Sequence, residues 1–543
     1  MSFRMACLTT AILFLAVVPA LADEHQHSHF GNMERLGRVH FPISCSASAQ
    51  QQFDVALAML YSFWYEESGK AFAAIADTDP RCAMAYWGVA MSGWHQLWTP
   101  PPNKEELKLG LAAVEKARAV GASTDRERAY IAAIEAFYKD SDKLEHRARA
   151  LAYEKAMADL SARYPDDREG AILYALALLA TAPKTDKTFA NQKQAGAILE
   201  KIYPLQPNHP GLTHFIIHSY DNPVLAQQGL GAARAYAKIA PDVPHALHMP
   251  SHIFVRLGYW QEAISSNLAS AAAARDYELQ ARLPGPWDER LHAMDYLAYA
   301  FLQSGQEGEA RRVLEEATIL TNPQAPSPKS WYALAAIPAR FTVERRHWTG
   351  AAFLMPRTGT WPAAEAITWW ARALGAAHMG DLDAARFDVD KLQSLENTLL
   401  ASKEAPSQYW AGQVEIQRRE AAAWLLHLEG KDDQALPLMR SAAELEDTSD
   451  KDPMTPGPVV PARELLGDFL LELMQPAAAL AEYETSLKTA PNRFNGLYGA
   501  ARAAEQAGQV AKARDFYAKL LDVCGKANEG PELHRAREYL AKK

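Results

Sequence analysis

Two pairs of histidines with the spacing H-x₃-H recur 34 residues apart, His214 with His218 and His248 with His252. Residues four apart on a helix lie on one face, with Cβ atoms about 5–6 Å apart. Six of the 17 histidines lie between His209 and His252, where an even spread would place about 1.4. Because imidazole nitrogens are ligands for Zn, Cu, Fe and Ni, the spacing indicates a candidate metal site.

The elements that must position these histidines are predicted to be helices. Strand signals are nearly absent and Ala is abundant. Apolar residues recur at i, i+3 and i+4 in segments such as 128–138, 170–180 and 363–377, which is typical of amphipathic helices. The sequence therefore predicts an all-α chain.

A 34-residue repeat is clearest near the C-terminus. Its first copy contains Gly467, Leu470, Ala479, Tyr483 and Pro491. Its second copy contains, in four of the same slots, Ala501, Ala504, Ala513 and Tyr517. A small residue at a close helix crossing, an aromatic that packs on the next unit and a terminal Pro are typical of stacked helix pairs.

On these residues the chain resembles tetratricopeptide-repeat (TPR) proteins. A looser sign, Gly followed five residues later by Ala, recurs at Gly258, Gly305, Gly380, Gly430 and Gly508. The resemblance covers most of the chain, with degenerate copies in the N-terminal third, and it implies a right-handed superhelical solenoid of antiparallel helix pairs. The segments Phe41–Cys45 and His245–His252 are also similar to exported bacterial repeat proteins, a similarity that implies no activity.

In TPR-like proteins, positions 2, 5, 9 and 12 of the first helix of each unit line a concave groove. Pro207 and Pro241 match the terminal Pro of the repeat and fix its register, and Gly305 anchors the next unit. The residues then predicted to face the groove are His214, His218, Asp221, His245, His248, His252, His292 and Asp295. Neighbouring helix axes lie about 8–10 Å apart, so the four imidazoles of the two H-x₃-H pairs could converge on one ion.

Two alternatives to a metal site stay open. The histidines could line a ligand groove without metal, or they could be structural, since two pairs in register could reflect duplication of one polar surface. Pro250 lies within the second helix and is expected to kink or restart it. The alignment of His245 with the groove is therefore weaker than that of His248 and His252.

The N-terminus predicts export. Arg4 precedes an apolar run from Ala11 to Ala20, and Ala20-Leu21-Ala22 has the A-x-A form of a cleavage site, so residues 1–22 are predicted to be a signal peptide of a secreted or periplasmic protein. Cleavage there would expose Asp23-Glu24-His25, a motif that can bind Cu(II) or Ni(II) through four nitrogens. The alternative is a disordered tail that contains histidine.

Charge and cysteine content limit the partners and the compartment. The formal charge is −9 with no Lys/Arg block, which argues against a nucleic-acid partner, and no apolar stretch is long enough to span a membrane. In an oxidising compartment Cys45 and Cys82 could form a disulfide, whereas Cys524 would stay a thiol; buried thiols at all three positions are the alternative.

The predicted organisation has five parts. They are a signal peptide at 1–22, a His-containing segment at 23–50, an N-terminal TPR-like array with the His-rich groove at 51–340, an irregular loop at 341–362 and a C-terminal TPR array at 363–543. A Pro-rich stretch, Asp447–Pro461, is a further candidate linker.

Two functions are compatible with this sequence. The first is a scaffold whose groove binds a protein, a peptide or a small ligand and carries a metal-binding His site. The alternative is an enzyme that depends on Cu, Zn or Fe, with Asp221 or Asp295 as acid or base. No P-loop, G-x-S-x-G, H-E-x-x-H or paired CxxC motif is present. The ligand count separates the two functions, because catalytic metals keep an open coordination position.

Overall fold

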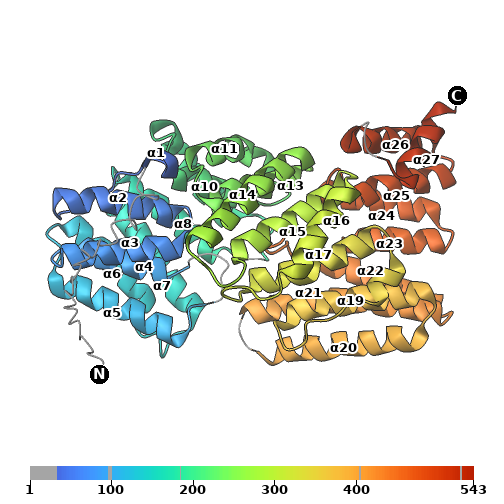
Figure 1. Cartoon of the computed structure of the whole chain (residues 1–543), viewed down its shortest axis with the longest axis horizontal. Coiled ribbons are helices and arrows are strands. Elements are labelled where there is room, and N and C mark those ends of the chain that lie inside the picture. The colour runs from blue at the N-terminus through green and yellow to red at the C-terminus, as the bar shows by residue number, and fades with distance from the viewer. Residues whose placement is uncertain (1–32, 96–100, 184, 403–404, 526–528, 543) are drawn as a thin grey trace, which may run out of the picture. The chain divides into compact units, whose positions relative to one another are not determined.

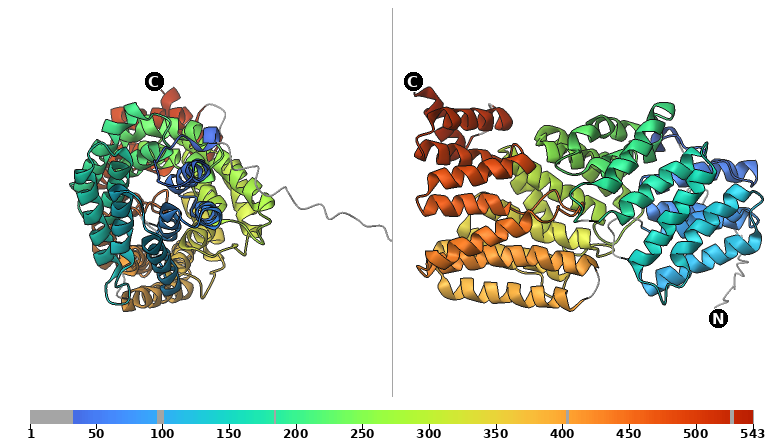
Figure 2. Two further views of the ribbon diagram at one scale, coloured as in Figure 1. Left: turned by 90° about the vertical axis from the view of Figure 1, so that its left-hand side faces the viewer. Right: turned by 180° about the vertical axis from the view of Figure 1, so that it is seen from behind.

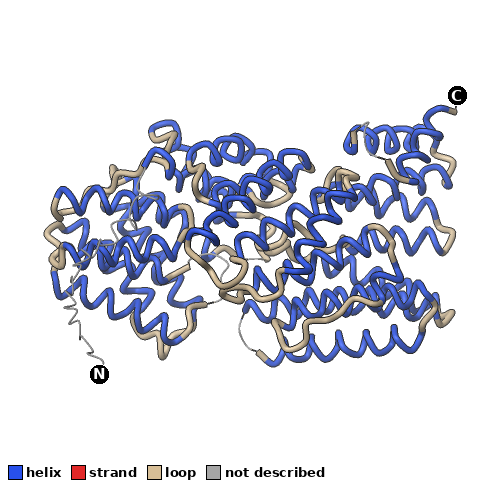
Figure 3. The backbone as a smooth tube through the Cα atoms, in the orientation of Figure 1, coloured by secondary structure: helices blue, strands red, loops and turns tan. Residues whose placement is uncertain are grey.

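The computed structural model describes residues 33–95, 101–183, 185–402, 405–525 and 529–542, and within them it is helical, without strands (Figure 3). The first half contains α1 (Met33–Leu36), α2 (Ala47–Tyr61), α3 (Tyr65–Thr78), α4 (Ala83–Gly93), α5 (Lys104–Val120), α6 (Asp125–Tyr138), α7 (His146–Arg163), α8 (Arg168–Thr181), α9 (Ala190–Ile202), the 3₁₀ turn η1 (Tyr203–Leu205), α10 (Pro210–Tyr220), α11 (Ala226–Ile239), α12 (Pro244–His248), α13 (Pro250–Leu257) and α14 (Trp260–Gln280). The second half contains α15 (Asp288–Gln303), α16 (Glu307–Ile319), α17 (Pro328–Glu344), α18 (Trp348–Ala352), α19 (Pro362–Met379), α20 (Leu382–Ala401), α21 (Ala405–Leu428), α22 (Asp432–Glu446), α23 (Ala462–Glu472), α24 (Pro476–Thr489), α25 (Phe494–Gln506), α26 (Val510–Cys524) and α27 (Pro531–Ala541).

The helices stack as successive pairs. Most helices pack closely against a neighbour in the chain, as α2 does with α3 and α25 with α26. First helices of adjacent pairs also touch, as α19 does with α21 (Figures 1 and 2). The prediction of an all-α, TPR-like solenoid is confirmed. No described helix is long and apolar enough to cross a membrane.

The repeat glycines of the C-terminal units make room for one aromatic ring. Tyr483 of α24 is buried, and a Cβ added to Gly467 or to Gly499 would come within 2.7 or 2.3 Å of its ring carbon Cζ. Glycine on two successive first helices therefore lets the Tyr483 ring pack between them. This contact is the physical basis of the repeat pattern in the sequence.

The segment expected to be an irregular loop at 341–362 is shorter than expected. α17 continues to Glu344 in spite of Pro338 inside it, and α18 forms from Trp348 to Ala352, so the irregular stretch begins at Phe353. Residues from Met33 to Lys543 form one compact unit. The two predicted arrays are therefore joined by continuous packing of α17 on α19.

The stretch Asp447–Pro461, expected to be a linker, packs inside the structure. Tyr296 of α15 donates its hydroxyl hydrogen to the carbonyl oxygens of Pro453 and Thr455, at 3.2 and 3.0 Å. Arg340 of α17 donates to the carbonyl oxygen of Pro458 at 2.7 Å. We call residues 447–461 the inner segment, and its contacts connect the C-terminal helices to α15 and α17.

Cys45 and Cys82 form a disulfide, with Cα atoms 5.2 Å apart, which joins the segment before α2 to the N-cap residue of α4. Cys524 is buried. The predicted signal peptide and the motif Asp23-Glu24-His25 lie outside the described residues.

Replacing Gly499 by Ala should destabilise the protein, because the new Cβ collides with the Tyr483 ring. Overpacking typically lowers the free energy of unfolding by about 1–3 kcal/mol, and urea titration followed by circular dichroism would measure it. Gly308→Ala is the matched control: it also lies in a helix but meets nothing within 4 Å, so Ala there should be neutral or stabilise by up to about 1 kcal/mol. Equal effects at the two sites would contradict this packing account.

Candidate metal centre

Four neighbouring helices bring six histidines together in the interior. The His cluster consists of His214 and His218 on α10, His245 and His248 on α12, His252 on α13 and His292 on α15. Every residue of α10 is buried, so its two imidazoles replace apolar side chains in a core helix. The side chain of His245 is 12% exposed, and the others are buried.

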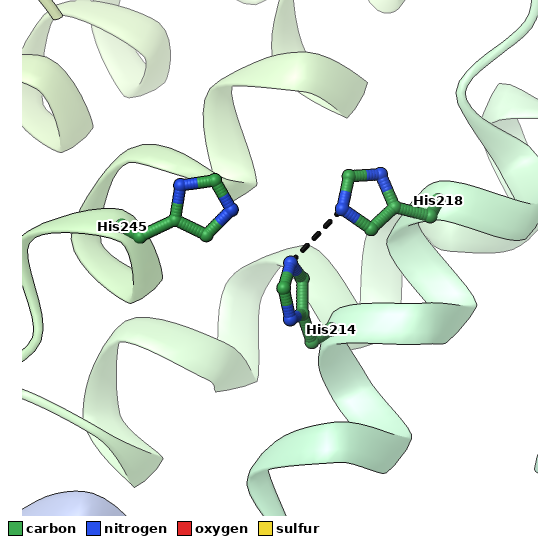
Figure 4. Close-up of side chains that lie close together, drawn as sticks. All are labelled: His214, His218 and His245. Atoms are coloured by element: carbon green, nitrogen blue, oxygen red, sulfur yellow. Dashed lines mark hydrogen bonds between the residues drawn. The ribbon is translucent and has the colours of Figure 1, made fainter. Parts of the chain in front are cut away.

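The His cluster divides into two triads. Triad 1 contains His214, His218 and His245, and triad 2 contains His248, His252 and His292; within each triad, one nitrogen from each ring lies within 4.8 Å of the others. Figure 4 shows triad 1, with the His214 and His218 rings facing each other from one helix. The four imidazoles of the two H-x₃-H pairs thus fall into two groups of candidate ligands, not into the single group that the sequence suggested.

The two triads follow the same rule of repeat positions. Each takes positions 5 and 9 from one unit and position 2 from the next, so His245 completes triad 1 and His292 completes triad 2. The triads also adjoin each other. Ring centroids of His218 and His252 are 6.0 Å apart and those of His245 and His248 are 6.1 Å apart, similar to the 6.3 Å between His252 and His292 within triad 2.

Oxygen acceptors hold four of the rings at Nδ1. In triad 1, His214 contacts the carbonyl oxygen of Tyr61 at 2.7 Å, and His245 contacts Glu289 Oε2 at 3.2 Å. In triad 2, Nδ1 of His248 lies 2.6 Å from Asn267 Oδ1 and Nδ1 of His252 lies 2.8 Å from Asp221 Oδ2. Such contacts fix the tautomer and the ring orientation of metal-binding histidines.

In triad 2, the Nε2 atoms of His248 and His252 face each other, and both are hydrogen-bond acceptors. The Asn267 amide is oriented by its own donation to the Ala263 carbonyl oxygen at 2.7 Å, so its oxygen points at His248 and Nδ1 of that ring carries the hydrogen. Asp221 likewise requires a hydrogen on Nδ1 of His252. In the neutral rings, two lone pairs then meet across 3.0 Å between the Nε2 atoms of His248 and His252.

Triad 1 has the same close approach. Nε2 of His214 and Nε2 of His218 are 2.9 Å apart. Nε2 of His245 is buried without a hydrogen-bond partner among the described residues. Two nitrogens that each lie about 2.0–2.1 Å from one ion, at a right angle, are about 3 Å apart, so both pairs have the separation of two ligands of one metal.

Burial keeps the imidazoles neutral. It lowers the pKa of His214, His218, His248 and His292 well below the ordinary value, and the neighbouring histidines lower it further. Neutral imidazole is the form that binds metal.

The two carboxylates that hold Nδ1 atoms stay ionised in the interior. Burial alone would raise the pKa of Asp221, but Lys451 and Arg256 hold it well below its usual range. Burial likewise opposes ionisation of Glu289, and Lys329 and His245 lower the pKa of that carboxyl well below the ordinary value. The centre therefore combines neutral ring nitrogens with negative charge one layer further out.

Aromatic rings cover the triads. The sequence predicted that the histidines line an open groove, but in the structure all of them except His245 are buried. Phe63, in the turn between α2 and α3, lies 4.3 Å from His214 and 5.6 Å from His245 between ring centroids. Tyr296 lies 4.6 Å from His248 and 5.2 Å from His292.

The two aspartates predicted as acid or base have different places. Asp221 holds His252 and also accepts from Arg256 Nε at 2.9 Å and from Lys451 Nζ at 3.3 Å. Asp295 lies outside both triads and pairs with Arg340 at 2.9 Å, and burial raises its pKa. Only Asp221 is thus in contact with a histidine of the cluster.

Sequence reasoning missed several supporting residues. Glu289 could have been found, because it lies three residues before His292 in the first turn of α15. Asn267 and Lys451 carried no signal, since they come from an outer helix and from the inner segment, 19 and 199 residues beyond the histidines they support.

Comparisons with known proteins identify no family for this chain. No family model matches the chain, and no curated protein matches it. Similar solved structures include the Cut9 and Hcn1 hetero-tetramer of APC/C (14% identity, TM-score 0.32, covering 91% of this chain and 89% of that one). A human IFIT1 dimer with PPP-AAAA has 13% identity and a TM-score of 0.36, covering 82% and 91%. The protein is an all-α solenoid of TPR-like helix pairs, and likenesses this low carry no argument about what it binds.

The hydrogen-bond pattern makes a prediction for the metal-free protein. The rings of His248 and His252 should be neutral with hydrogen on Nδ1, and they should not titrate near the ordinary histidine pKa of about 6.5, because burial lowers the pKa of both. Nitrogen-15 shifts of labelled histidine, recorded from pH 8 to 5.5, would measure this. A hydrogen on Nε2 of both rings would contradict the assignment.

Proposed function

We propose that this protein binds two transition-metal ions, one on each triad of the His cluster, inside a TPR-like scaffold. The observation that carries the proposal is the approach of His248 Nε2 to His252 Nε2 at 3.0 Å while both Nδ1 atoms face oxygen acceptors. Two opposed lone pairs repel each other, and a cation bound between them converts this repulsion into coordination. His214 and His218 repeat the approach at 2.9 Å.

The donor set limits the metal. Three neutral imidazoles and no carboxylate suit Zn, Cu or Fe better than Mg or Ca, which prefer oxygen. Asp221 and Glu289, both ionised and one layer away, would offset part of the positive charge of two ions. Adjoining triads would place the two ions in one dinuclear centre.

The ligand count supports a second function, that of a metal-dependent enzyme. Structural zinc sites are almost always closed by four protein ligands, whereas catalytic sites keep three and leave a position for water or substrate. Each triad supplies three. Asp221, hydrogen-bonded to His252 Nδ1, would orient that ring. The alternative function is a scaffold that binds a protein, a peptide or a small ligand.

Export remains part of the proposal. The predicted signal peptide at 1–22 and a disulfide between Cys45 and Cys82 both suit a secreted or periplasmic protein, because disulfides persist in oxidising compartments.

Metal analysis of protein purified without an affinity tag tests the two-ion centre. Mass spectrometry should find about two equivalents per chain, and His214→Ala or His292→Ala should each lower the content to about one, because a two-nitrogen site binds far more weakly. His378→Ala is the control: this partly buried ring stacks on Trp348, away from the cluster. A wild type without metal, or variants that keep both equivalents, would refute the proposal.

Removing the acceptor of His248 should weaken the metal without removing a ligand. Asn267→Ala should lower metal affinity by about 10–100-fold, the usual effect of losing an outer partner, as measured by competition with a chelator. Asn222→Ala is matched, since Asn222 is also buried but accepts from the backbone N–H groups of Val224 and Leu225. Equal loss in the two variants would indicate a general effect on stability.

A further inference from the structure

The C-terminal half contains a cavity whose lining includes no residue of the His cluster. This cavity of about 40 Å³ lies among α17, α19, α21, the end of α22 and the inner segment, and its lining includes Glu420, Glu446, Trp370, Trp410 and Tyr332. By this measure a water needs about 10–15 Å³. The cavity therefore accommodates a group about three water molecules in size.

Two acids line this cavity, Glu420 on α21 and Glu446 at the end of α22. Glu420 is 2% exposed; its Oε2 accepts from Trp370 Nε1 at 2.7 Å, and its Oε1 is buried with no hydrogen-bond partner among the described residues. Glu446 Oε1 accepts from the Ala462 N–H at 3.0 Å. None of the described residues that line the cavity is basic. Buried polar atoms normally have partners, so Glu420 Oε1 marks a place for a donor.

Burial disfavours the ionised form of both carboxyl groups. Burial raises the pKa of Glu420 well above its ordinary value, and the nearby Glu446 raises it further. Burial also raises the pKa of Glu446 to about 7. A cation in the cavity would stabilise the ionised form of both carboxyl groups.

The walls select the kind of cation. Trp370 is buried, and the rings of Tyr332 and Trp410 lie 6.0 Å apart between centroids. Hard metal ions require six or more oxygen ligands, whereas aromatic faces attract organic ammonium groups within about 6 Å. Gln413 and Gln417 precede Glu420 by seven and three residues on α21, which places three side chains with acceptor oxygens on one helix face.

We propose that this cavity, the Glu420 pocket, binds the ammonium head group of a small alkylamine. The N–H groups would donate to Glu420 Oε1 and to Glu446, and the alkyl part would lie against Trp370 and Trp410. This proposal does not depend on metal in the His cluster. It adds a second class of ligand to the one proposed there.

Calorimetric titration of the full chain at pH 8 with methylammonium chloride tests the proposal. Saturable binding is expected beyond the heat of equal sodium chloride, and neutral ethanol, similar in size, should not bind. Glu420→Gln should weaken binding at least tenfold. Glu415→Gln is the matched control on the same helix, because that side chain faces Arg419 and does not line the cavity, and it should bind as the wild type does.

A further variant and a pH series keep the test decisive if Glu420→Gln fails to fold. Trp410→Leu leaves both acids in place and should weaken binding about fivefold. The charged groups that act on the two acids are Glu420 and Glu446 themselves, with Asp447, Glu464 and Arg493 around Glu446. Because a cation favours the ionised carboxyls, binding should strengthen from pH 6 to pH 8.

The outcomes that would overturn the Glu420 pocket are equally specific. Wild type without saturable binding would mean that the cavity holds water only. Equal binding of ethanol, or undiminished binding by Glu420→Gln, would show that the charge is not recognised. Binding by His248→Ala should equal that of the wild type, which separates this proposal from the metal centre.

Discussion

The structure of the His cluster depends on the contact of His248 Nε2 with His252 Nε2 at 3.0 Å. Neither ring can turn away, because Asn267 and Asp221 hold their other nitrogens, and neither is easily protonated, because burial lowers the pKa of both. Unpaired polar atoms in the interior cost about 1–3 kcal/mol each. A cation shared by the two nitrogens offsets that cost, and the Nε2 atoms of His214 and His218 lie equally close, at 2.9 Å.

Holding Asp221 ionised in the interior links distant parts of the chain. Its partners are Arg256 on α13 and Lys451 on the inner segment, and Arg256 also pairs with Asp450 at 3.0 Å. Removing one member of a buried ion pair typically costs 3–5 kcal/mol. The inner segment is therefore held in place by the charges that orient His252, so the C-terminal helices contribute to the His cluster through residues 450–455.

Sequence reasoning predicted the fold and named all six histidines of the His cluster, because both depend on spacing. The 34-residue period placed both H-x₃-H pairs, and a ring between glycines, as at Tyr483, leaves its pattern in the chain. The division into two triads was not predicted, because it depends on how far apart adjacent helices lie. The contacts of the inner segment and the Glu420 pocket could not be predicted from the sequence, because they join residues that no periodicity relates.

The histidines that complete the two triads bear most directly on whether the His cluster is a metal centre or a duplicated polar surface. His245 and His292 are 47 residues apart, not 34, so simple duplication of one unit would not place both. The extra residues lengthen α14 to 21 residues, against 14 in α11, and extend the turn before α15. The added length is taken up by an outer helix and a loop, and position 2 of α15 still reaches triad 2. Two triads of identical composition thus arise from unequal spacings, and simple duplication of one unit does not account for them.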